Sequence, residues 1–320
     1  MTKVKNGRRK GILFAVGIIL VVVLCGLTYM FFTKTWLFDN KPTISFSKEP
    51  LFTTENYPKF DASTATQPLA IAFMENFTGT KVTDESALDF TKTHQAYEKL
   101  INGKVDLILV TSPSDDEKNL ATSKGFELEI TPVVHEGFVF YVNKNNPIDN
   151  LTITQIQDIY SGKITNWNKV GGNDEAIVAY QRPVNSGSQT GMLDLVMKDK
   201  PLMQPISGTV QESMSSIVNI VSSYNSNEQN GIGYSYYYYA TTMYQDIDAS
   251  VANNIKFLEI DRVYPDSESI QTGIYPFKTS YYIVMNKNAS EDSSVRKLKN
   301  AMLSDRGQAV ALEANYVPVK

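Results

Sequence analysis

The residues best suited to do chemistry lie in one short loop, Arg182 to Thr190, which reads Arg-Pro-Val-Asn-Ser-Gly-Ser-Gln-Thr. Ser186 and Ser188 carry hydroxyls, and Gly187 has no side chain to keep a ligand away. Arg182 adds a planar fork of N–H donors that stays charged. Beside the free backbone N–H groups of a helix start, these groups can hold an oxyanion. A plain helix-capping loop with an exposed arginine is the alternative, because short Gly/Ser motifs recur by chance.

This loop joins a predicted strand to a predicted helix. Residues 177–181 are few and rich in β-formers, which predicts a short buried strand. Leu193, Val196 and Met197 follow at i, i+3 and i+4, so they share one apolar helical face. Either serine of the loop can cap this helix, and the junction then presents N–H groups at the positive end of the helix dipole.

Hydroxyl residues mark three more junctions. Thr64 and Thr93 stand at the starts of two further predicted helices, and Thr93 is the expected N-cap of the second. Residues 105–110 predict a buried strand that ends at Thr111. Each position alone is typical of an ordinary cap or strand end. Gathered in one cleft with Ser186, they would surround one tetrahedral anion.

Charge and composition exclude several classes of function. Residues 1–32 hold five basic residues and no acid, so the rest carries 25 basic against 34 acidic residues, a net of -9. That balance argues against nucleic acid as a partner. Two histidines and the single Cys25 leave no metal-ligand spacing and no intrachain disulfide. With no nucleophile or cofactor motif either, we expect no enzyme activity, no metal and no cofactor.

The N-terminal segment predicts a membrane anchor. Residues 11–32 contain no charge and are long enough to cross a ~30 Å hydrocarbon core as a helix. The cations before them place residues 1–10 in the cytoplasm and the main domain outside. A cleaved signal peptide and lipidation at Cys25 are the alternatives, although Leu24 stands where a lipidation signal has a small residue. Residues 33–56 indicate a stalk.

Beyond the stalk, strand and helix patterns alternate from about Tyr57 to the C-terminus. This alternation predicts an α/β fold with mainly parallel strand pairing. Further segments with a strand or helix pattern are 137–143, 151–160, 217–221, 231–239, 281–285 and 295–311. No internal repeat interrupts the order.

Four stretches of this body are distinctive: 61–69, 105–111, 159–172 and 182–190. The most specific is 159–172, where Gly-Lys-Ile-Thr-Asn-Trp precedes a Gly-Gly turn. In this order the stretches resemble the extracytoplasmic phosphate-binding proteins of ABC importers, within the type II periplasmic-binding-protein superfamily. The resemblance covers nearly all of the chain after the stalk.

The resemblance implies a two-lobed α/β fold that closes on its ligand like a clamshell. Lobe 1 would comprise residues 57–143 and 275–320, and lobe 2 residues 144–274, with hinge strands at 138–142 and 281–285. The ligand-binding positions that it implies are Thr64 with the Ala65 backbone, Thr93, Thr111, Arg182, Ser186, Gly187 and Ser188.

The chain departs from the family at Thr111, where the family places an aspartate that accepts the proton of hydrogen phosphate. A carboxylate there rejects sulfate, which has no proton to give, whereas a threonine imposes no such penalty. Asp61, Asp106 and Glu136 are candidate substitutes. The departure leaves the choice between phosphate and another oxyanion open.

Taken together, the residues and the resemblance imply a monomeric, membrane-anchored receptor that captures phosphate or a related oxyanion for an ABC permease. A surface sensing or interaction protein that kept the fold without transport is the alternative, because a fold does not by itself define a function.

Overall fold

The computed structural model describes residues 49–223 and 230–320. The expected cytoplasmic tail (1–10), membrane anchor (11–32) and most of the stalk (33–56) lie outside these residues. None of the helices within the described ranges is long and apolar enough to cross a bilayer. Residues from 48 to the C-terminus form one compact unit, and all that follows concerns this unit.

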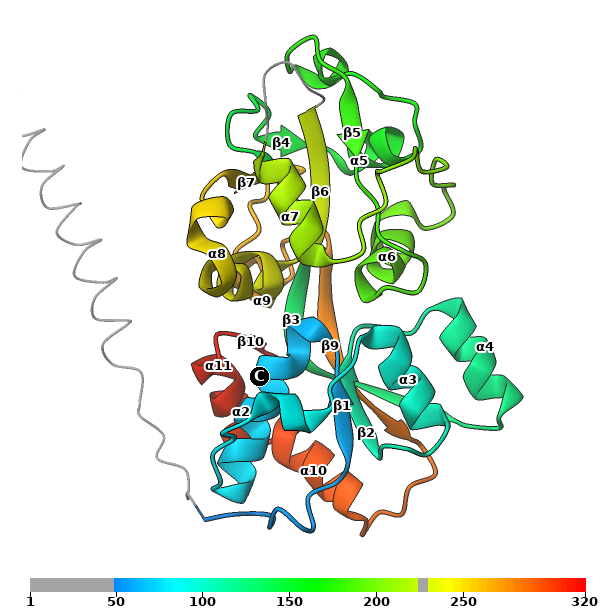
Figure 1. The fold of residues 1–320 in the computed structure, drawn as a ribbon, viewed down its shortest axis with the longest axis vertical. Helices are drawn as coiled ribbons and strands as arrows, with labels where there is room; N and C mark the ends of the chain where they lie inside the picture. The colour runs from blue at the N-terminus through cyan, green and yellow to red at the C-terminus, as the bar shows by residue number, and fades with distance from the viewer. Residues whose placement is uncertain (1–48, 224–229) are drawn as a thin grey trace, which may run out of the picture. The chain divides into compact units, whose positions relative to one another are not determined.

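Two α/β lobes make up the unit, and two long strands run between them (Figure 1). The main sheet has eight strands in the order β1-β2-β9-β3-β6-β5, and β10 and β7 also pair with β3. A separate pair, β4 with β8, lies in the second lobe. The strands are β1 (Phe60–Ala62), β2 (Leu107–Val110), β3 (Leu128–Asn143), β4 (Asn150–Leu151), β5 (Ile177–Ala179), β6 (Asn230–Tyr236), β7 (Ile255–Phe257), β8 (Glu259–Ile260), β9 (Lys278–Asn286) and β10 (Val317–Pro318).

The predicted mainly parallel pairing is wrong for the centre of the sheet. Parallel pairs occur at β1–β2, β5–β6 and β4–β8, but β9 pairs antiparallel with β2, and β3 pairs antiparallel with all four of its neighbours. The reason is topological. The chain enters the second lobe along β3 and returns along β9, so these two strands run in opposite directions.

β3 changes partners at the boundary between the lobes. Its first part pairs with β9 as far as Gly137, and from Phe138 onward it pairs with β6. The expected hinge segment 138–142 therefore lies inside the sheet of the second lobe, and 281–285 lies inside the sheet of the first. The crossover is at Gly137 and Lys278, which face each other in register. The division of the chain at 143/144 and 274/275 stays a prediction.

The first lobe packs helices against β1, β2 and β9. In α2, Leu69, Phe73 and Phe77 are fully buried. The expected cap of α3 is wrong by one position, because Lys92 is the N-cap and Thr93 is the first helical residue. The helices of this lobe are η1 (Thr64–Thr66), α2 (Gln67–Thr78), η2 (Glu85–Leu88), α3 (Thr93–Ile101), α4 (Asp115–Ser123), α10 (Ser294–Leu303) and α11 (Asp305–Glu313).

In the second lobe, the indole N–H of Trp167 donates to the carbonyl of Asn230 at 2.9 Å, which ties the distinctive Trp segment to β6. Helix α6 continues into the π-helical η4, whose wider turn rotates the expected apolar face. Val196 and Met197 are buried, whereas Leu193 is 42% exposed. The helices are α5 (Ile153–Tyr160), η3 (Trp167–Val170), α6 (Gly187–Gly191), η4 (Met192–Met197), α7 (Met214–Ser222), η5 (Tyr239–Met243), α8 (Tyr244–Ala252) and α9 (Ser267–Thr272).

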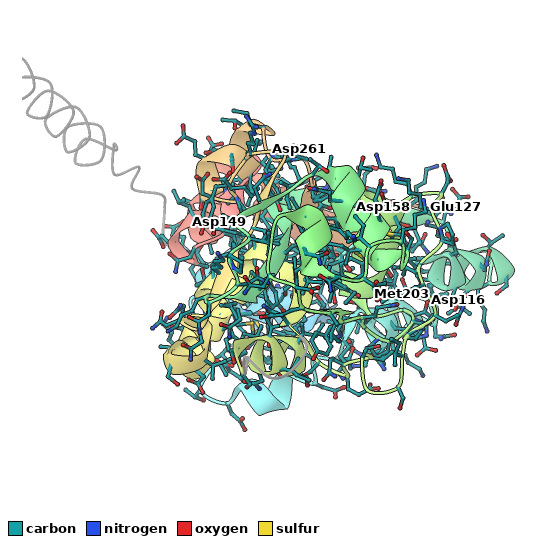
Figure 2. The ribbon with its side chains drawn as sticks, turned by 90° about the horizontal axis from the view of Figure 1, so that it is seen from above. Asp116, Glu127, Asp149, Asp158, Met203 and Asp261 are labelled. Atoms are coloured by element: carbon teal, nitrogen blue, oxygen red, sulfur yellow. The ribbon has the colours of Figure 1, made fainter. Side chains whose placement is uncertain are left out.

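Acidic side chains lie on the outside of the second lobe. Asp149 and Asp261 are exposed, and both are labelled in the view from above (Figure 2). Because exposed charges are screened beyond ~8 Å, they do not prevent an anion from binding at local donors elsewhere.

Candidate functional site

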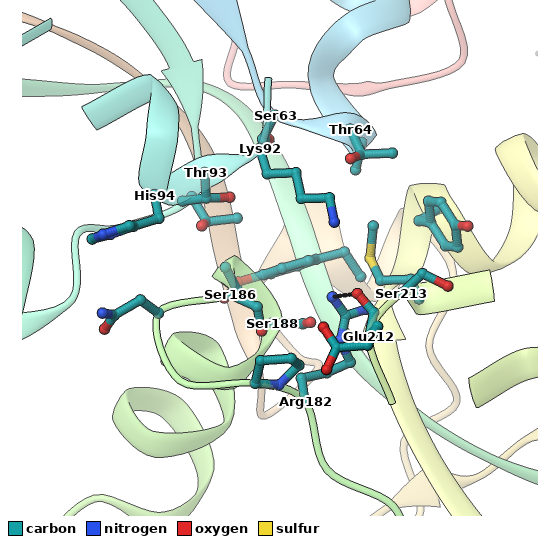
Figure 3. Close-up of a pocket in the computed structure, with 18 of the residues that line it drawn as sticks. Ser63, Thr64, Lys92, Thr93, His94, Arg182, Ser186, Ser188, Glu212 and Ser213 are labelled. Carbon is teal, nitrogen blue, oxygen red and sulfur yellow. Dashed lines mark hydrogen bonds between the residues drawn. The ribbon is translucent and has the colours of Figure 1, made fainter. Parts of the chain in front are cut away.

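A cavity of about 440 Å³ opens between the two lobes (Figure 3). Its walls come from the start of η1, the start of α3 and the end of β2 in the first lobe, and from the α6 loop, the start of α7 and β6 in the second. All eight residues expected to bind ligand line it: Thr64, Ala65, Thr93, Thr111, Arg182, Ser186, Gly187 and Ser188. Segments far apart in the sequence therefore converge as the oxyanion hypothesis requires.

Arg182 is a buried cation with free donors. Its side chain is only 8% exposed. The Nη2 atom donates to the carbonyl of Glu212 at 3.1 Å, but Nε and Nη1 have no hydrogen-bond partner among the described residues. Burial lowers the pKa of Arg182, although a guanidinium remains charged at any physiological pH. A buried charge with unpaired donors is costly unless an anion accepts from it.

The Ser-Gly-Ser loop lies opposite the threonines of the first lobe. Ser186 caps α6, since its hydroxyl accepts from the backbone N–H of Gln189 at 3.3 Å. A Cβ on Gly187 would lie 2.5 Å from Thr111 Oγ1 and 2.7 Å from Thr93 Oγ1. The close approach of the two lobes at this point therefore needs a residue without a side chain.

Tyrosine hydroxyls of the first lobe fix the backbone of two cavity residues, Thr111 and Ala65. The Tyr97 hydroxyl donates to the carbonyl of Thr111 at 2.9 Å, and that of Tyr316 donates to the carbonyl of Ala65 at 2.9 Å. The hydroxyl of Thr111 is buried and has no hydrogen-bond partner within the described part of the chain. Thr93 is the first residue of α3 and not its cap, and its hydroxyl faces the Gly187 loop, 2.7 Å from where a Cβ on Gly187 would lie. Both hydroxyls remain available to a ligand.

Sequence reasoning missed several residues of the cavity wall. Lys92 extends from the first lobe into the cavity, on the side opposite Arg182 (Figure 3). The position of Lys92 directly before Thr93, a predicted ligand-binding residue, was the sequence signal that could have placed it at the site. Glu212 is the only carboxylate among the described residues that line the cavity, and it is exposed. The other residues that line the cavity without having been predicted as ligand-binding are Ser63, His94, Gln95, Pro183, Val184, Asn185, Ser213, Met214, Ser215, Tyr236 and Tyr239.

The carboxylates considered as substitutes for the missing aspartate lie elsewhere. Asp61 accepts from the Thr91 hydroxyl at 2.6 Å, and Asp106 accepts from the backbone N–H of Lys59 at 2.9 Å. Glu136 lies at the crossover of β3 and accepts from its neighbour's N–H. None of the three lines the cavity. In residues 49–223 and 230–320 no group of three or more His, Cys, Asp or Glu could hold a metal ion.

A family model described as a PBP superfamily domain matches residues 60–306. The chain belongs to the PBP superfamily. The resemblance drawn from the four sequence stretches is thereby confirmed at the level of the superfamily, and so is the two-lobed α/β fold that it implied.

Among curated superfamily members, the chain is 28% identical over 270 residues to the phosphate-binding protein PstS of Staphylococcus saprophyticus, covering 82% of this chain and 80% of that protein. It is 30% identical over 231 residues to the protein of the same name from Staphylococcus epidermidis, and the match covers 70% of this chain and 67% of that protein.

Two solved structures show the same fold. One is a putative phosphate ABC transporter substrate-binding protein with bound phosphate from Clostridium perfringens, with a TM-score of 0.62 and 22% identity, covering 83% of this chain and 100% of that one. The other is an ABC-type phosphate transport receptor from Vibrio cholerae, with a TM-score of 0.59 and 20% identity, covering 81% and 98%.

Proposed function

We propose that this protein captures phosphate or a related tetrahedral oxyanion between its lobes and delivers it to an ABC permease. The observation that carries the proposal is the buried guanidinium of Arg182, whose Nε and Nη1 have no partner in the described structure. Hydroxyls of both lobes line the same cavity, and the relatives named above are phosphate-binding proteins. An oxyanion would satisfy all of these donors at once.

The mechanism that follows is binding coupled to lobe closure. An anion held by Arg182 and the Ser186–Ser188 loop on one lobe, and by Thr64, Thr93 and Thr111 on the other, binds the closed form better than the open one. The ligand therefore shifts the open–closed balance toward the closed form, which a permease can distinguish from the open form. The eight ligand-binding assignments and a monomeric state are part of this proposal.

Membrane attachment is also part of the proposal. Residues 11–32 would anchor the chain with its N-terminus in the cytoplasm and its binding unit outside, where an importer collects its substrate. Comparing the N-terminal sequence and the mass of the purified chain with those of the full sequence tests this, because a cleaved or lipidated chain would differ from it.

Calorimetric titration of the full-length chain with orthophosphate and with sulfate tests the binding step. Arg182→Ala should weaken binding by at least about 30-fold, the loss typical when one partner of a buried charge pair is removed. Arg262→Ala is the matched control, because Arg262 is exposed and does not line this cavity. No binding of either anion to the wild type would reject the function, and an unchanged affinity of Arg182→Ala would reject the site.

A sensing or interaction protein without transport is the second candidate. Thr111 favours it, since no residue of the described cavity wall supplies the inner carboxylate that a selective phosphate receptor would use. Measurement of phosphate and sulfate uptake in cells lacking this chain separates the two. Impaired uptake supports import, and intact uptake together with tight binding in vitro supports sensing.

A further inference from the structure

Lys92 occupies an unusual place for an exposed lysine. It is the N-cap of α3, where its backbone is extended and its side chain makes no cap hydrogen bond. The side chain extends into the cavity from the first lobe, whereas Arg182 enters it from the second (Figure 3). No acid among the described residues pairs with it, although Lys99 of the same helix binds Asp61 and Asp89.

The charges around the cavity leave two positive groups for a ligand. Arg182 uses one N–H on a backbone carbonyl and keeps Nε and Nη1 free. His94 also lines the cavity, but its Nδ1 lies 3.0 Å from Oε1 of Glu117, a residue outside the cavity wall. Glu212 is the one carboxylate in the described cavity wall, and it is exposed. Each positive charge attracts a ligand of charge −2 about twice as strongly as a ligand of charge −1, and Glu212 offsets only part of this preference.

We propose that Lys92 is a ligand-binding residue that makes the site select oxyanions of charge −2 over those of charge −1. This inference rests on the proposed oxyanion binding and names its ligand class, which sulfate and hydrogen phosphate share. The two cations come from opposite lobes, so they repel each other when the lobes approach without a ligand. A dianion between them offsets more of this repulsion than a monoanion does, so it favours closure more strongly.

Sulfate and perchlorate provide a direct test, because both are tetrahedral ions without a proton and differ in charge, −2 against −1. Calorimetric titration of the full-length chain at about pH 8 should show sulfate or orthophosphate, mostly dianionic at this pH, binding at least about tenfold more tightly than perchlorate. Comparing the dissociation constants of sulfate and orthophosphate then shows which of the two dianions the site prefers.

The variant Lys92→Met should weaken binding of the preferred dianion by about tenfold or more and perchlorate binding by much less. Lys92→Arg should restore most of the preference, since it restores the charge. Lys104→Met is the matched control: it removes the same charge just beyond the end of α3, from an exposed side chain outside the cavity wall.

A ratio of dianion to perchlorate affinity that is the same in wild type and Lys92→Met would overturn the role of Lys92 while leaving oxyanion binding intact. If no tetrahedral anion binds the wild type, the proposed function and this inference both fail. A thermal-unfolding scan of each variant without ligand confirms that a lost affinity does not reflect a lost fold.

Discussion

Gly187 shows how a single residue sets the distance between the lobes at the cleft. Its backbone does not have the positive φ that favours glycine, so the requirement is for space. Two hydroxyls of the first lobe, on Thr93 and Thr111, occupy the volume that a methyl group would need. The hydroxyl of Tyr236 donates to the carbonyl of Gly187 at 2.8 Å and holds the loop in this position.

At the residue scale we therefore predict that Gly187→Ala lowers the affinity for the bound oxyanion by at least about tenfold, because the methyl group forces the two threonines away. Without ligand the lobes can part and relieve the clash, so the free energy of unfolding should change less. Calorimetry and chemical denaturation measure the two effects. Gly103→Ala is the control for affinity only: a Cβ at Gly103 meets no atom within 4 Å, so binding should not change, but the positive φ of this residue makes the variant less stable. Wild-type affinity in Gly187→Ala would show that the lobes do not approach this closely around the ligand.

The crossover in β3 is the element that joins the two lobes, and it contains a buried acid. Glu136 accepts hydrogen bonds from the N–H of Gly137 at 2.8 Å and from the N–H of Tyr238, beyond the end of β6, at 3.2 Å. Burial raises the pKa of Glu136 from its ordinary value of 4.5 to about 7, and these N–H donors offset only part of the shift. The folded state therefore binds the proton of Glu136 more tightly than the unfolded chain does.

At the element scale this shift predicts a pH-dependent stability. The contribution of Glu136 is fully present below pH 4.5 and is lost as the pH rises through about 7. The free energy of unfolding of the wild type, relative to Glu136→Gln, should thus decrease between about pH 5.5 and 8. Denaturant titrations of both proteins across this range measure the difference.

Glu129→Gln is the control for that experiment. Lys299, followed by Arg296, holds the pKa of Glu129 below its usual range, so its contribution is lost only at more acidic pH. The difference between the wild type and Glu129→Gln should be flat between pH 5.5 and 8. An equally flat difference for Glu136→Gln would contradict the assignment of a raised pKa at the crossover.

In the whole described unit, the ligand cleft is where the two lobes meet. Besides the crossing strands, a hydrogen bond of 2.8 Å joins Asn185 of the α6 loop to Asp116 of α4 on the opposite lobe. Asp116 is exposed and the hydrogen bond lies at the surface, so this contact contributes little by itself. An anion that touches both lobes would add a link between them at the cleft itself.

We accordingly predict that a bound oxyanion stabilises the unit by mass action, by about 2.7 kcal/mol at 100 times the dissociation constant. The unfolding temperature should rise with the logarithm of anion concentration in the wild type and rise much less in Arg182→Ala over the same concentrations. Chloride at matched ionic strength controls for screening. A shift of equal size in Arg182→Ala would place the stabilising anion outside the cleft.

The sequence by itself determined the features that depend on neighbouring residues. The Ser186 cap, the buried strand before Thr111 and the alternation of strands with helices follow from hydrogen bonds and apolar periodicity within about ten residues. The family resemblance added which of these local features belong to one site. The membrane anchor at 11–32 stays a prediction, because those residues lie outside the described ranges.

Only the tertiary structure decided how these local features combine. It brought the hydroxyls of Thr93 and Thr111 so close to Gly187 that a methyl group on Gly187 would clash with both. About 75 or more residues separate Gly187 from either threonine along the chain. It also placed Lys92 in the cavity and located the crossover at Gly137, within the single strand β3 that runs from one lobe into the other. Local patterns carry no record of which distant segment a strand pairs with or a side chain faces, because packing between the lobes sets those contacts.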